Sequence, residues 1–111
     1  SAHVALNEED LSESLKQAAP LISQLHLANA ILEPQAQGYG DYHMKFGAPG
    51  FLTLSTAKDI LKAAVSLTGL SPELGPLSVA IEMRTTEQDD LWDNERQCRE
   101  FLQQAWPTAT C

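Results

Sequence analysis

The chain of 111 residues has few cysteines, few basic residues and no long apolar run. Its two cysteines, Cys98 and Cys111, are too few for a disulfide-built secreted domain, so we expect free thiols and a cytoplasmic location. Periplasmic export stays open, because the chain starts at Ser1 without a methionine, and a bridge between the two cysteines would then be worth testing. No stretch approaches the roughly 20 apolar residues that span a bilayer, so we predict no membrane segment.

Basic residues are scarce: seven lysines and arginines stand against 15 aspartates and glutamates, for a net charge of −8. This charge repels phosphate backbones and anionic lipids at long range, so we predict no direct binding to nucleic acid. Five acids and no base fall between Glu87 and Glu95, a block more typical of a solvated helix face than of a site. Solubility alone can explain the acidity, and a basic partner protein is the other interpretation.

The first half of the chain carries both helical and strand patterns. Apolar residues at three-to-four spacing predict a helix that begins with Asn7 as its N-cap and is kinked or broken near Pro20. The pattern leaves Leu27–Glu33 open as helix or strand. After a glycine-containing loop over Gln35–Gly40, alternation predicts a short strand over Asp41–Phe46.

The second half begins with the clearest helical pattern. Thr56 and the acid three residues later resemble a capping box, and they predict a helix that runs to Leu67 and is ended by Gly69. A proline-bounded turn over Pro72–Pro76 then precedes an alternating strand over Leu77–Arg84.

The last helix is expected to start between Thr85 and Asp89, with Thr85 or Thr86 as its cap, and to end near Trp106 before Pro107. Together these elements predict an α+β fold, one small domain over residues 1–111 with a two- or three-stranded sheet packed by helices. Within that sheet we expect Val79 and Ile81 to be buried under the helix over 56–67.

The three histidines and their neighbours are the candidate metal ligands and acid–base groups of the chain. We place His3 in a loose terminus, His26 on a helix without a second ligand four residues on, and His43 in a strand. Asp41 and His43 share one side of that strand and Tyr42 does not, but no nucleophile motif accompanies them. We therefore predict no metal, no cofactor and no catalytic residue, which favours a protein that is not an enzyme.

The last helix carries the most informative pattern. On a helical wheel, Cys98, Leu102, Ala105 and Trp106 fall within about 60° of Leu91, and Trp92 and Phe101 widen this apolar face to about 180°. We expect Leu91, Cys98 and Leu102 to be buried together. Large aromatics are also enriched at the centres of protein interfaces, and a homodimer would need only one such self-complementary face. The candidate protein-binding residues are Leu91, Trp92, Phe101, Leu102 and Trp106.

The chain resembles a family in its length, its acidity and its helix-rich α+β organisation. From N-E-E-D-L-S-E-S-L at Asn7 to W-D-N-E-R-Q-C-R-E-F-L at Trp92, it is similar to Pseudomonas quorum-sensing antiactivators of the QslA type. The resemblance implies a cytoplasmic protein that binds the ligand-binding domain of a LuxR-type transcription regulator at its dimerisation surface. Such binding would block dimerisation and hence DNA binding, and it implies no catalytic residues.

Two other classes of protein-binding domain fit the same charge and size. An acidic secretion chaperone would shield an aggregation-prone or basic client, although we expect a larger mixed sheet in that class. A toxin-neutralising immunity protein could cover a basic nuclease site with its acidic block, through electrostatic complementarity. The identity of the bound protein would separate these alternatives from the antiactivator.

Overall fold

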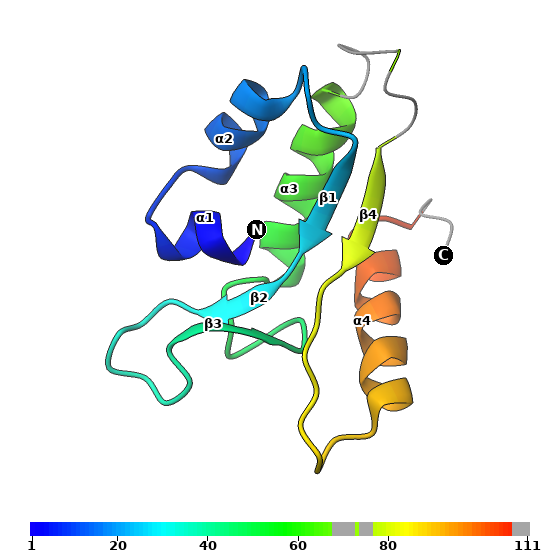
Figure 1. Ribbon diagram of the computed structural model, residues 1–111. Helices are drawn as coiled ribbons and strands as arrows, with labels where there is room; N and C mark the ends of the chain where they lie inside the picture. Colours follow the sequence, from blue (N-terminus) through cyan, green and yellow to red (C-terminus); the bar gives the residue numbers. More distant parts are fainter. Residues whose placement is uncertain (68–72, 74–76, 108–111) are drawn as a thin grey trace.

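The computed structural model describes residues 1–67, 73 and 77–107, and over these residues it confirms the predicted α+β class. The described helices and strands are, in chain order, α1 (Ala2–Leu6), α2 (Leu11–Ala18), β1 (Gln24–Leu27), β2 (Asn29–Ile31), β3 (Gly40–Met44), α3 (Leu54–Leu67), β4 (Ser78–Ile81) and α4 (Leu91–Ala105) (Figure 1). Among the described residues, no helix is long and apolar enough to cross a membrane.

The strands form two small sheets of two strands each. β1 and β4 are parallel, with Leu25 opposite Val79 and Leu27 opposite Ile81. Parallel neighbours need a long connection, and here the chain passes through β2, β3 and α3 before it returns as β4. β2 pairs with β3 in antiparallel fashion, with a shift of register, and a single residue, Ala28, separates β2 from β1.

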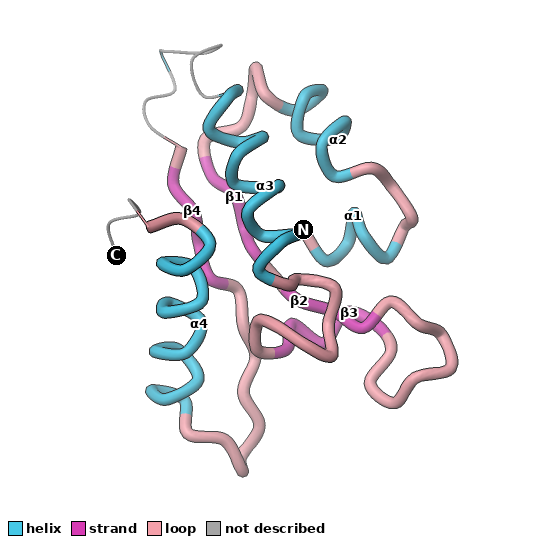
Figure 2. The backbone as a smooth tube through the Cα atoms, turned by 180° about the vertical axis from the view of Figure 1, so that it is seen from behind, coloured by secondary structure: helices cyan, strands magenta, loops and turns pink. Residues whose placement is uncertain are grey.

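The hydrophobic core lies between the β1–β4 sheet and the helices. α3 lies behind β1 in Figure 1 and in front of it in the reverse view of Figure 2, and both α2 and α4 contact α3. This arrangement covers one face of the sheet with helices, as the sequence predicted. The buried residues of this core are Leu15, Leu25, Leu27, Phe46, Leu52, Ala57, Ile60, Leu61, Ala64, Cys98, Leu102 and Ala105.

The prediction that a helix starts at Asn7 is wrong. Asn7 instead ends α1, and α2 begins after Asp10, whose Oδ1 accepts a hydrogen bond of 2.8 Å from the Glu13 amide. Both residues are good capping types three positions apart, so their spacing alone did not separate them. The predicted break near Pro20 is confirmed as the end of α2 at Ala18.

The open question over Leu27–Glu33 is settled in favour of strand, because β1 ends within this segment and β2 lies inside it. The terminus is also ordered, contrary to expectation. The Ser1 hydroxyl donates to the Ala28 carbonyl at 2.9 Å and accepts from the Ala28 amide at 3.0 Å. Ala2 packs in a second small cluster with Ala28 and Ala30, so α1 is docked where β1 meets β2.

The helix predicted over residues 56–67 is confirmed as α3, which starts earlier than predicted. Thr53 accepts the Thr56 amide at 3.3 Å, so Thr56 lies inside the first turn and is not the cap. The strand after Gly40 and the strand after Leu77 are likewise confirmed, in shorter form. The helix end at Gly69 and the turn over Pro72–Pro76, apart from residue 73, lie outside the described residues.

The burial expected for β4 is only partly correct. Ile81 packs against the core, but Val79 is 38% exposed. β4 has only β1 as a hydrogen-bonded neighbour among the described strands, and an edge strand of so narrow a sheet is incompletely covered.

Candidate functional site

The start of α4 is held by two consecutive aspartates. Asp90 is the N-cap, and its Oδ1 accepts from the amides of Trp92 at 3.0 Å and Asp93 at 3.1 Å. Asp89 closes the preceding turn, because its Oδ2 accepts from the Thr86 amide at 2.8 Å and from the Thr86 hydroxyl at 2.9 Å. The helix thus begins at Leu91, later than predicted, and Thr86 acts as a donor to an aspartate instead of a cap.

The same hydrogen bonds keep this end of the helix negatively charged. The hydrogen bond from the Thr86 amide, followed by the one from the Thr86 hydroxyl, lowers the pKa of Asp89. A hydrogen bond from the Arg96 side chain lowers the pKa of Asp93. Glu87, Asp89 and Asp90 have no ion pair among the described residues.

The arginines of α4 do not neutralise this charge. Arg96 pairs with Asp93 and with Glu100, and Arg99 pairs with Glu95, all within the same helix. Surface pairs of this kind contribute little to stability. Both arginines are therefore engaged by carboxylates within the helix, and the cation that acts on Asp89 is Lys45, whose charge helps to lower the pKa of that carboxyl.

The predicted apolar face of α4 divides into a buried part and an exposed part. Cys98 and Leu102 are buried, and Phe101 packs edge to face on Phe46 with ring centroids 5.7 Å apart. Trp106 is the C-cap residue, as predicted, and is partly buried against the core. Three of the five candidate binding residues, Phe101, Leu102 and Trp106, therefore belong to the core.

The other two candidates, Leu91 and Trp92, are 50% and 78% exposed. The expectation that Leu91 is buried with Cys98 and Leu102 is wrong. Leu91 is exposed because the first turns of α4 extend past the end of the β1–β4 sheet, as Figures 1 and 2 show. We call Glu87, Asp89, Asp90, Leu91 and Trp92 the α4 tip.

Cys98 has the buried, inert character expected of a core cysteine. Its Sγ lies 3.5 Å from the Met83 Sδ, and burial raises the pKa of its thiol. Buried thiols with raised pKa values are poor nucleophiles. Cys111, the proposed partner in a disulfide, lies outside the described residues.

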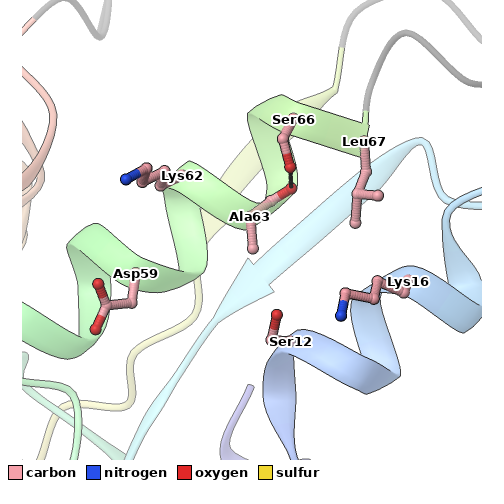
Figure 3. A pocket seen from close by; sticks show the side chains of 7 residues that line it. All are labelled: Ser12, Lys16, Asp59, Lys62, Ala63, Ser66 and Leu67. Carbon is pink, nitrogen blue, oxygen red and sulfur yellow. Dashed lines mark hydrogen bonds between the residues drawn. The ribbon is translucent and has the colours of Figure 1, made fainter.

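A shallow groove of about 280 Å³ lies between α2 and α3. In Figure 3, Ser12 and Lys16 extend from α2 toward α3, whose side of the groove includes Asp59, Lys62 and Ser66. Lys16 is paired with Glu13 at 3.5 Å, and the Ser66 hydroxyl donates to the Ala63 carbonyl at 2.7 Å. The residues lining the groove include lysines and an aspartate but no histidine or cysteine.

The structure also brings His3 to Asp41 and His43, which the sequence had placed on one side of a strand. His3 Nε2 lies 2.8 Å from Asp41 Oδ2, and His43 Nε2 lies 2.8 Å from Asp41 Oδ1. The predicted shared side of Asp41 and His43 is confirmed, whereas the placement of His3 in a loose terminus is wrong. No local signal brings His3 to β3, because the contact depends on the docking of α1.

Comparison of the chain with protein-family models, with curated proteins and with solved structures gives no match, so the α4 tip and the histidine cluster are interpreted from their own geometry.

Proposed function

We propose that this protein is a non-catalytic regulatory domain of the cytoplasm that binds another protein through the α4 tip. The observation that carries the proposal is Trp92, a tryptophan 78% exposed on a helix start that Asp90 holds in place. Tryptophan is the residue type most enriched among interface residues that dominate binding energy. A side chain on a capped helix also loses less conformational freedom on binding than one on a loop.

The charge around Trp92 supports a partner of defined chemistry. Glu87, Asp89 and Asp90 carry negative charge beside an apolar pair, Leu91 and Trp92. Complementary potentials across an interface speed encounter and suppress wrong partners. The partner surface that fits is an apolar pocket bordered by lysines or arginines.

The resemblance to antiactivators of the QslA type makes a LuxR-type transcription regulator the first candidate. In this proposal the α4 tip occupies the surface through which two regulator ligand-binding domains pair, and the blocked regulator no longer binds DNA. An inhibitor of this kind need not touch DNA, which is consistent with its net charge of −8.

Self-association through the same surface is the second part of the proposal. A two-fold axis needs only one patch, so a homodimer through Leu91 and Trp92 would cover Trp92 when the partner is absent, although it would also bring the acids of the two tips together. Light scattering over a range of concentrations tests this: we expect a dimer that Trp92→Ala dissociates. A wild-type chain that stays monomeric at every concentration would remove the homodimer from the proposal.

Comparative capture from extracts of the native cell tests the partner. The bait is the wild-type chain, with Trp92→Ala as the test variant and Leu21→Ala as the control. Leu21 is 86% exposed in the connection between α2 and β1, at the opposite end of the molecule from the α4 tip (Figure 1). We expect a transcription regulator that is retained by wild type and Leu21→Ala and is lost from Trp92→Ala.

Other results of the same experiment contradict the antiactivator. An exported effector retained by the bait would indicate the secretion chaperone, and a basic nuclease toxin would indicate the immunity protein. A partner retained equally by all three baits would show that binding does not use the α4 tip.

A further inference from the structure

All three histidines of the chain lie in one cluster with two carboxylates. His3 comes from α1, His26 from β1, and Asp41 and His43 from β3, while Glu82 directly follows β4. The His3–Asp41 and Asp41–His43 contacts are both 2.8 Å. Elements from four parts of the chain therefore converge on Asp41 and Glu82, and none of these five residues belongs to the α4 tip.

The Asp41–His43 contact is not a hydrogen bond. Asp41 Oδ1 and His43 Nε2 are close, but neither atom has a hydrogen-bond partner among the described residues, and both are inaccessible to solvent. Unsatisfied buried polar atoms are rare, and each one requires an explanation such as an ion. Two such atoms side by side, one an imidazole nitrogen and one a carboxylate oxygen, are the donor types that transition metals use.

The backbone of His43 is also unusual. Its φ angle is +47°, in the left-handed region that residues with a Cβ seldom adopt. Residues held in this region cost free energy and gather at ligand-binding and active sites. Here the unusual conformation occurs in the strand residue whose ring contacts both Asp41 and Glu82.

We propose that His3 Nε2, the Asp41 carboxylate and His43 Nε2 bind a divalent transition metal, with Zn²⁺ the ion that fits best. The three ligand atoms lie within 4.8 Å of one another. Tetrahedral Zn²⁺ with bonds of about 2.0–2.2 Å separates its ligands by roughly 3.3 Å. The 2.8 Å contacts join each histidine to a different oxygen of Asp41, so binding requires these contacts to open slightly and the carboxylate to turn toward the ion. Three protein ligands leave the fourth position for water.

Glu82 supplies the outer-shell partner that such a site needs. A histidine that ligates zinc commonly donates its other ring N–H to a carboxylate, which fixes the tautomer and orients the ring. His43 Nδ1 lies 3.4 Å from Glu82 Oε1, on the side of the ring away from Asp41. His26 Nδ1 lies 3.3 Å from the other Glu82 oxygen and outside the ligand set, which makes it a matched control.

The bound ion would join α1 to β3. A helix of five residues is unstable alone, and packing and side-chain contacts must hold it. His3 would be the metal ligand that α1 supplies. Because Zn²⁺ would bind only the folded arrangement, it would raise the unfolding temperature of the domain.

The test is calorimetric titration of Zn²⁺ into the metal-free full chain, with visible absorption of Co²⁺ as a second probe of four-coordinate geometry. The amino group is acetylated, because a free amino terminus two residues before His3 can chelate metals without the cluster. We expect one Zn²⁺ per chain and a rise in Tm of at least about 5 °C at a hundredfold excess over Kd.

The variants are His3→Gln, Asp41→Asn, His43→Gln, Glu82→Gln and His26→Gln, each checked for an unchanged Tm without metal. Loss of an outer-shell partner lowers metal affinity about 10–100-fold. We therefore expect the affinity of Glu82→Gln to fall by a factor in this range, and the affinity of each ligand variant to fall by more. His26→Gln should bind within about twofold of wild type. Absence of saturable binding below about 1 mM, or equal affinity in wild type and Asp41→Asn, would overturn the site.

Discussion

Gly50 and Asn29 fit together with no room for one more carbon atom: a Cβ on Gly50 would lie 2.2 Å from Asn29 Oδ1. Asn29 is fully buried, and three of the four hydrogen bonds of its amide group join β2 to the segment between β3 and α3. Its Nδ2 donates to the carbonyls of Lys45 and Gly47, both at 2.8 Å, and its Oδ1 accepts from the amides of Ala30 at 3.0 Å and Leu52 at 2.9 Å.

A double-mutant cycle tests this relationship. Asn29→Ala leaves buried backbone groups unpaired and should cost at least about 2 kcal/mol of unfolding free energy. Gly50→Ala alone should cost about 1–3 kcal/mol through overpacking, and clearly less in the Asn29→Ala background, where space is free. Denaturant unfolding measures all four proteins. Additive costs would show that the two residues do not compete for the same space.

The N-caps of α4 and α2 allow a matched comparison. Asp90→Ala and Asp10→Ala each remove one capping carboxylate, so each should lose about 1 kcal/mol of unfolding free energy. Only Asp90→Ala should also weaken partner binding, because this cap holds the amide of Trp92. Equal loss of binding in both variants would attribute the effect to general destabilisation.

The aromatics further along α4 should behave as core residues. Phe101→Ala removes the ring that packs on Phe46, and for a largely buried aromatic the cost approaches 3 to 5 kcal/mol of unfolding free energy. Trp92→Ala should stay within about 0.5 kcal/mol of wild type, as surface changes usually do. Urea unfolding of the two variants gives the comparison, and similar costs for both would contradict this division of the helix.

We expect the buried thiol of Cys98 to make the stability of the fold depend on pH in the alkaline range. Because burial raises the pKa of its thiol in the folded state, the unfolded chain loses this proton first as pH rises. Unfolding free energy should therefore be unaffected by Cys98 below the ordinary thiol pKa of about 8.5 and fall as pH increases above it. Denaturant unfolding at pH 7 and above 9 should show a smaller decline in Cys98→Ala. An equal decline in both proteins would rule out the thiol as its source.

The sequence was most informative where a pattern was long and local. The helix through Ile60 and Leu61, the strand through Ile81 and the end of α4 at Trp106 followed from periodicity and turn residues. The exposure of Leu91 did not, because a helical wheel gives the direction of a side chain but not the length of the sheet below it.

The contacts of His3 show a second limit of prediction from the sequence. Asp41 and His43 could be placed on one side of a strand from their spacing. His3 could not be placed beside them, because its position depends on the packing of Ala2 against Ala28 and on the hydrogen bonds of Ser1. Contacts between distant segments follow from tertiary packing, which periodicity in one segment does not report.

The most direct test of the account is the Kd of Trp92→Ala for the ligand-binding domain of a LuxR-type regulator, measured by calorimetry beside wild type and Leu21→Ala. We predict binding about 30-fold weaker for Trp92→Ala, which corresponds to roughly 2 kcal/mol, with thermal unfolding and the Leu21→Ala affinity unchanged. Equal Kd values for all three proteins, or no binding by folded wild type, would contradict recognition of this regulator through the α4 tip.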